Sequence, residues 1–183
     1  MKKALILASS VAIAASALAF NSGLNKGERV SPFHPTHVAG PLANTSNCFP
    51  CTFQNRPQVQ VWVNGDDAKN VLAIAKALDK ASVKHEGKEF KSMIVWITDP
   101  ANMDAAKAAA TKFAKQIGSN RVDVSVIGRN DSAVSQYKIN LDSGIKNTVF
   151  AYRNWTVREK MVNFKADKAG IEALNGAIDA LAK

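Results

Sequence analysis

The order in which strand and helix patterns follow one another is the feature that most limits how this chain can fold. Residues 58–63 alternate apolar and polar side chains, which predicts a strand, and residues 71–83 repeat apolar side chains at helical spacing. The continuous apolar run 93–97 predicts a strand covered on both faces. Residues 103–117 then predict a second helix, and residues 122–126 predict a third strand.

The alternation of strands and helices ends after this third strand. Residues 132–138 can form a short helix, and residues 147–152 and 157–164 read as two strands joined by a tight turn. A last helix is expected after Asp167, a suitable N-cap residue. A doubly wound parallel fold would continue with further βα units instead of closing with a hairpin and one helix. The sequence therefore predicts an α/β domain with a mixed central sheet.

Besides the order of strands and helices, three segments resemble segments of a known family. MIVWITD at residues 93–99 looks like a central strand that ends in a polar turn, DSAVSQYKI at 131–139 like a short helix leading into a strand, and NTVFAYRN at 147–154 like that strand. Over about residues 57–182 the chain thus resembles the thioredoxin-like superfamily, in the branch of peroxiredoxins and exported thiol-disulfide oxidoreductases. The resemblance implies a three-layer α/β sandwich with a C-terminal β-hairpin and helix.

Two departures from that family concern its active site. The family carries a C-x-x-C or a peroxidatic cysteine where this chain has Asn64-Gly65-Asp66-Asp67, and carboxylates cannot act as redox nucleophiles. The family's cis-proline before the penultimate strand is also missing, because Lys146 and Asn147 occupy the corresponding positions. The usual activity therefore cannot be assigned by position.

The N-terminal residues predict export. A short positive start, the apolar run 4–18 and the small-x-small pattern at 17–19 are typical of a secretory signal peptide over residues 1–19. An uncleaved anchor is disfavoured, because a membrane-spanning helix needs about 20 apolar residues. We expect a mature protein without a stable membrane span, periplasmic or extracellular, in a compartment where disulfides can form.

Residues 20–56 differ in composition from the domain expected at 57–183. They contain four of the six prolines and show no sustained period, which predicts an irregular, extended N-terminal arm. The arm carries H-x-x-H (His34, His37) and C-x-x-C (Cys48, Cys51) within 18 residues. The third histidine, His85, lies in a charged loop, where we expect it to be exposed to solvent.

Three interpretations of these four residues remain open. In the first, the protein performs thiol-disulfide redox chemistry or redox sensing, which needs no cofactor; by analogy with C-x-P-C motifs Cys48 attacks, Cys51 resolves, and His34 or His37 tunes the thiolate. In the second, His34, His37, Cys48 and Cys51 bind a metal ion, either tetrahedral Zn²⁺ or, with one imidazole, Cu(I). In the third, the disulfide is structural and the domain is a redox-inert interaction module. Enzyme activity is thus undecided, and the expected partners are protein thiols or a metal ion.

The charge adds little to these alternatives. The chain has a net charge of +9, but its lysines are spread along predicted helices, where solvated helix faces usually carry them. No basic cluster is interleaved with aromatic residues, so a nucleic-acid partner is not expected.

Overall fold

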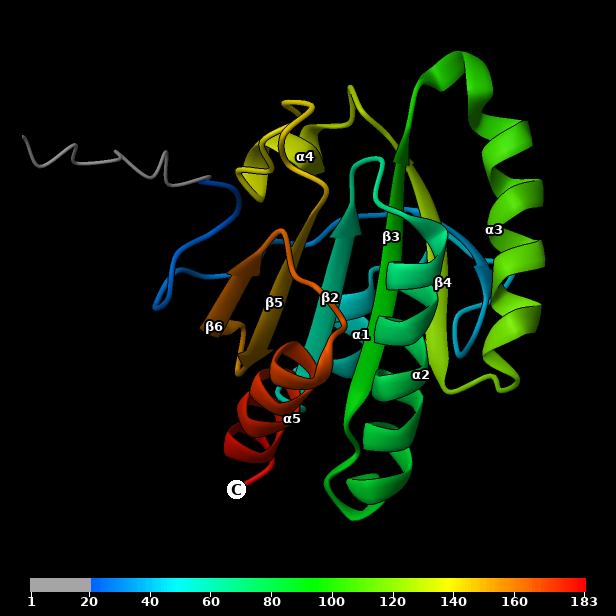
Figure 1. Ribbon diagram of the computed structural model, residues 1–183. Coiled ribbons are helices and arrows are strands. Elements are labelled where there is room, and N and C mark those ends of the chain that lie inside the picture. Colours follow the sequence, from blue (N-terminus) through cyan, green and yellow to red (C-terminus); the bar gives the residue numbers. More distant parts are fainter. Residues whose placement is uncertain (1–20) are drawn as a thin grey trace, which may run out of the picture.

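A six-stranded mixed sheet organises residues 21–183, the part of the chain that the computed structural model describes (Figure 1). The expected signal peptide at 1–19 lies outside these residues. The strands follow the order β1-β4-β3-β2-β5-β6 across the sheet. Their bounds are β1 (Thr36–Ala39), β2 (Gln58–Val63), β3 (Lys91–Thr98), β4 (Val122–Gly128), β5 (Asn147–Arg153) and β6 (Thr156–Val162). The helices are α1 (Phe49–Phe53), α2 (Ala68–Lys84), α3 (Met103–Ile117), α4 (Ser132–Gln136) and α5 (Lys168–Leu181), with 3₁₀ turns η1 (Glu86–Lys88) and η2 (Pro100–Asn102).

Strand directions confirm the predicted mixed sheet. Strands β2, β3 and β4 are parallel, β5 is antiparallel to β2, and β6 is antiparallel to β5. The hairpin turn between β5 and β6 holds Asn154 and Trp155, both at positive φ (53° and 63°). Two such residues in succession are typical of the turns whose twist matches that of a hairpin. The closing hairpin therefore forms as the sequence predicts.

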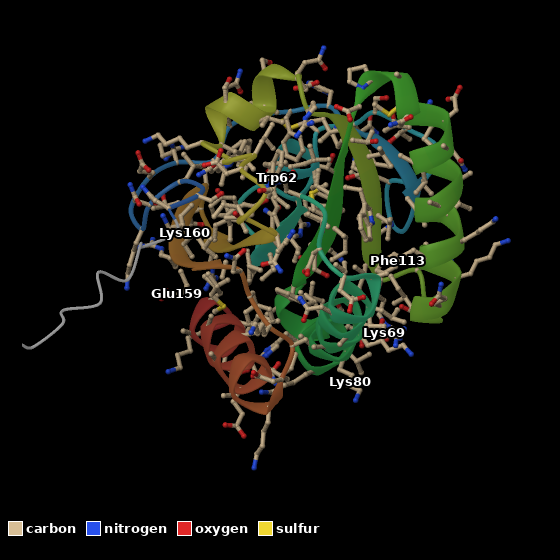
Figure 2. The ribbon with its side chains drawn as sticks, turned by 45° about the horizontal axis from the view of Figure 1, so that its top comes forward. Trp62, Lys69, Lys80, Phe113, Glu159 and Lys160 are labelled. Atoms are coloured by element: carbon tan, nitrogen blue, oxygen red, sulfur yellow. A yellow bond between two sulfur atoms is a disulfide. The ribbon has the colours of Figure 1, made fainter. Side chains whose placement is uncertain are left out.

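Helices α2, α3 and α5 cover one face of the sheet (Figure 1). The alternating valines of β2 point into this layer, and Phe113 of α3 packs edge-to-face on Trp96 with ring centroids 5.2 Å apart. Asp67 and Asp167 cap the N-termini of α2 and α5, as aspartate does at many helix starts. The lysines expected on solvated faces lie there, among them Lys69 and Lys80 on the outer side of α2 (Figure 2).

An aromatic layer covers the opposite face, where α1 and α4 lie together with the arm. Trp62 of β2 is fully buried among these side chains (Figure 2). Its ring lies 4.7 Å from that of Tyr137 and 5.1 Å from that of Phe33, centroid to centroid. The structure thus has the three layers of the expected sandwich. Within residues 21–183, no helix combines the length and the apolar character needed to cross a bilayer.

The arm is more ordered and more closely packed than its composition suggests. Most of it lacks helix or strand, as expected, but it supplies the edge strand β1 and the short helix α1. It also pairs with the opposite edge of the sheet, where the N–H groups of Gly27 and Val30 donate to carbonyl groups of Val157 and Trp155. The reason is burial: several of its apolar side chains lie in the aromatic layer, namely Leu24, Val30, Phe33, Leu42 and Phe49.

Candidate functional site

Cys48 and Cys51 form a disulfide at the start of α1. Their Cα atoms are 5.2 Å apart, within the range that a disulfide requires. Cys48 is the N-cap residue, and its Sγ accepts a hydrogen bond from the backbone N–H of Cys51 at 3.1 Å. Pro50 lies in the first turn, where its missing N–H costs no helical hydrogen bond. The C-x-x-C motif therefore forms a helical turn that brings its two sulfurs together.

The two cysteines differ in exposure. Cys48 is 5% exposed, whereas Cys51 lies on the surface. Next to Cys48, Phe49 is fully buried and packs edge-to-face on Phe53, with ring centroids 4.7 Å apart. Because this aromatic pair anchors α1 against the sheet, one cysteine is held in the core while the other faces solvent.

His37 connects the disulfide segment to the sheet. Its side chain lies on β1 and is fully buried, with Nδ1 2.5 Å from Oδ1 of Asp123 on β4. Its Nε2 is 2.8 Å from the carbonyl oxygen of Asn47, the residue before Cys48. The other carboxylate oxygen of Asp123 accepts a hydrogen bond from the N–H of Leu42 at 3.1 Å. A chain of hydrogen bonds, buried at Asp123 and His37, therefore runs from β4 to the peptide that precedes Cys48.

These contacts fix the protons of the His37–Asp123 pair. Nε2 of His37 carries a hydrogen, because the carbonyl oxygen that it faces can only accept. A proton also lies between Nδ1 and the carboxylate, since two lone pairs would repel each other at this distance. Burial is the main cause that raises the pKa of Asp123, and the hydrogen bond from His37 acts against it.

A glycine allows the arm to approach β4 this closely. Gly40 follows β1 with φ at +91°, a conformation that other residues adopt at a cost. A Cβ atom at this position would lie 2.5 Å from Cα of Asp123 and 2.6 Å from the carbonyl oxygen of Val122. The backbone contact at Gly40 thus places Leu42 and the rest of the loop over Asp123.

The other two histidines lie apart from this network. The exposed His34 contacts the carbonyl oxygen of Ser46 through Nδ1 at 2.9 Å. His85 ends α2, and its Nε2 is 2.8 Å from Oδ1 of Asp179 on α5. The expectation that His85 is a freely exposed residue was wrong, because its side chain is only 14% exposed and packs at the junction of two helices.

The disulfide form does not present the four metal ligands together. Both sulfurs are bonded to each other, and both ring nitrogens of His37 have hydrogen-bond partners. Among residues 21–183, no group of three or more His, Cys, Asp or Glu side chains is placed to hold a metal ion. A Zn²⁺ site with all four ligands would require reduction of the disulfide and release of His37, and a Cu(I) site with one imidazole would require the reduction, so both stay predictions for the reduced protein.

Comparison with solved structures identifies the architecture. A protein described as thiol:disulfide interchange protein DsbE from Chlorobium tepidum superposes with a TM-score of 0.62 over 87% of this chain and 99% of its own, at 17% identity. The fold is thioredoxin-like. Peroxidoxin BcpB from Mycobacterium tuberculosis (TM-score 0.58, 16% identity, 85% and 97% covered) and copper-bound ScoI from Arabidopsis thaliana (0.55, 9%, 84% and 99%) share it. No protein-family model and no curated relative matches the sequence.

The turn between β2 and α2, where the sequence resemblance would have a reactive cysteine, is filled by a polar network. Asp66 lies between β2 and α2, and its Oδ2 accepts hydrogen bonds from the side-chain amides of Asn70 at 2.8 Å and Asn147 at 2.6 Å. The side-chain oxygen of Asn147 accepts from the N–H of Phe164 at 2.8 Å. These bonds join α2, β5 and the segment after β6. A structural role thus explains the carboxylate that departs from the family pattern.

Asp123 is the site residue that sequence reasoning missed. It lies between Val122 and Val124 in β4, on the opposite face from these valines, and is fully buried. A charged residue inside an alternating strand indicates a buried polar interaction, because a buried carboxylate needs a hydrogen-bond partner. Its partner His37 lies 86 positions away, so no local pattern links the two.

Proposed function

We propose that this protein is an exported, periplasmic or extracellular thioredoxin-fold protein that exchanges its Cys48–Cys51 disulfide with thiols of other proteins. In this role it acts either as an oxidoreductase or as a redox sensor. The observation that carries the proposal is a bonded cysteine pair with one member on the surface, where another thiol can reach it. Export is supported by the signal-peptide pattern of residues 1–19, and an exported cysteine pair can stay oxidised, since disulfides persist in oxidising compartments.

The chemistry needs no cofactor. A partner thiolate attacks one sulfur, the Cys48–Cys51 bond breaks, and the second sulfur leaves with the electron pair. A second partner thiolate then attacks the mixed disulfide, so that the partner becomes a disulfide and the protein is reduced by two electrons. The reverse sequence reduces a partner disulfide.

Reduction of insulin disulfides by the mature protein, residues 20–183, tests the proposal. With excess dithiothreitol as electron source, the wild type should accelerate insulin reduction, while the double variant Cys48→Ser/Cys51→Ser should match the reaction without protein. A wild-type rate no higher than that of the double variant would reject the oxidoreductase role. A sensor would instead show a two-electron transition in glutathione buffers, measured by alkylation and mass.

Metal carriage is the second candidate, supported by the copper-bound ScoI structure, which shares the fold. It would use His34, His37, Cys48 and Cys51 after reduction, with Zn or Cu as the ion. Elemental analysis of protein purified under reducing conditions tests it. Less than about a tenth of an equivalent of either metal would end this candidate, because sites with such ligands bind tightly.

A further inference from the structure

We infer that Cys51 is the sulfur that forms mixed disulfides with partners, and that Cys48 is the buried sulfur that leaves and later resolves them. This order is the reverse of the one expected from C-x-P-C motifs, and it rests on the exchange chemistry proposed above. It assigns the partner-contacting role to the second cysteine of the motif.

Access to solvent is the first argument. Thiol-disulfide exchange requires the attacking sulfur to reach one of the two bonded sulfurs, so its course depends on which of them is accessible. Cys51 lies on the surface, together with its neighbour Thr52, whereas Cys48 is 5% exposed. A partner thiolate can approach Cys51 without a change in the fold. Attack at Cys48 would require α1 to move away from the sheet.

The leaving group is the second argument. Attack at Cys51 places the electron pair on Sγ of Cys48, which already accepts the N–H of Cys51 at 3.1 Å. A hydrogen bond to a thiolate stabilises its charged form, and a more stable thiolate leaves faster. Among residues 21–183 no hydrogen bond to Sγ of Cys51 is found, so attack in the other direction would release a less stabilised sulfur.

The fixed backbone of Cys48 is the third argument. The carbonyl group before it accepts from His37, and its own carbonyl oxygen accepts from both N–H and Oγ1 of Thr52 at 2.9 Å. His37 is in turn held by Asp123 on β4. Cys48 therefore stays beside Cys51 after the bond between them breaks. A resolving thiol must remain in this place.

The electrons balance in both directions. When the protein oxidises a partner, a partner thiolate bonds to Sγ of Cys51 and Cys48 leaves as a thiolate. A second partner thiolate then attacks the partner's sulfur, and Cys51 leaves as the second thiolate. When the protein reduces a partner, the Cys51 thiolate attacks one sulfur of the partner disulfide, and the other partner sulfur leaves as a thiolate. Cys48 then attacks Sγ of Cys51, which restores the protein disulfide and releases the second partner thiolate.

Single-cysteine variants test the assignment, with 5,5′-dithiobis(2-nitrobenzoate) as the thiol probe. In folded protein, the Cys51 thiol of Cys48→Ser should react at least about tenfold faster than the Cys48 thiol of Cys51→Ser, because access controls the rate. In guanidinium chloride the two rates should agree within about twofold, since burial no longer distinguishes them. Equal rates in the folded state, or a faster Cys48, would overturn the assignment.

A measurement on the wild type keeps the test valid if a variant does not fold. Reduced wild-type protein is treated with a limiting amount of iodoacetamide, and the label is located by peptide mass. Most of it should be on Cys51, and a majority on Cys48 would contradict the inference. The outcomes separate the two proposals: failure to reduce insulin rejects the oxidoreductase, whereas insulin reduction with Cys48 labelled first rejects only this order of attack.

Discussion

Replacement of Asp123 by alanine tests the buried network beneath the disulfide. The substitution removes the acceptor of the Leu42 N–H and the partner of Nδ1 of His37, and both groups remain buried. Each buried polar group left without a partner costs about 1–3 kcal/mol. Removal of one member of a buried pair costs about 3–5 kcal/mol. We therefore expect Asp123→Ala to lower the free energy of unfolding by about 3–5 kcal/mol.

Replacement by asparagine should be much milder. The asparagine oxygen can accept from the N–H of Leu42, and its amide can donate to Nδ1 of neutral His37, whose Nε2 still donates to Asn47. Every buried group then keeps a partner, so Asp123→Asn should cost about 1 kcal/mol or less. Asp104→Ala is the control, because that side chain is 97% exposed and its loss should change the stability by at most about 0.5 kcal/mol.

Urea denaturation of the oxidised proteins, followed by circular dichroism, measures these differences. Thermal unfolding should agree, with a loss of about 2–4 °C for each kcal/mol in a domain of this size. Equal losses for Asp123→Asn and Asp123→Ala would refute the donor and acceptor assignment. A loss below about 1 kcal/mol for Asp123→Ala would show that the network does not hold the arm.

Three further predictions concern the aromatic layer, the arm and the disulfide. Burial raises the pKa of Tyr137 and Tyr152, the two tyrosines of the chain. The stability that a raised pKa contributes is complete below the pKa of the unfolded chain, about 10. It is lost as the pH rises through the pKa of the folded protein. Absorbance at 295 nm should therefore rise only with alkaline unfolding, and tyrosinate formation near pH 10 in folded protein would contradict this. Gly40→Ala should lower the free energy of unfolding in urea by more than about 2 kcal/mol, because the added Cβ meets backbone atoms at a residue with positive φ. Gly87→Ala is the control, since open space surrounds that position. Equal stabilities of the two variants would exclude the close approach of the arm to β4. Reduction of the disulfide should lower the free energy of unfolding by about 2 kcal/mol, because the bond closes a four-residue loop and restricts the unfolded chain. The stability of the double serine variant should not change with reductant. A wild-type stability that reductant leaves unchanged would contradict this prediction.

Much of the fold follows from local patterns. Strands β2, β3 and β4 have alternating or continuous apolar residues, and the hairpin β5–β6 has a tight turn between two such runs, so periodicity alone finds them. The arm lacks such patterns. Strand β1 has only four residues, and α1 is a single turn. Elements this short gain their order from burial against distant residues, which a local window does not include.

The site was predictable in its sulfurs but not in its surroundings. The spacing of Cys48 and Cys51 indicates that they can bond, and the structure confirms this. The sequence gives no hint that His37 turns toward Asp123 instead of toward the sulfurs, because that choice depends on which strand lies beside β1. Exposure of the two cysteines likewise depends on Phe49, whose burial requires the completed sheet.

The path of the arm has a consequence for assembly and solubility. Residues 27–30 of the arm pair with β6 at one edge of the sheet, and β1 pairs with β4 at the other edge. The N-terminal arm thus covers both edges of the sheet that the rest of the domain leaves unpaired. The outer side of β1 is itself bonded to residues 44–45. A chain beginning at residue 57 would expose two unpaired strands at once and should aggregate through them. Because those strands are synthesised long after the arm, the segment that emerges early must be among the last to dock.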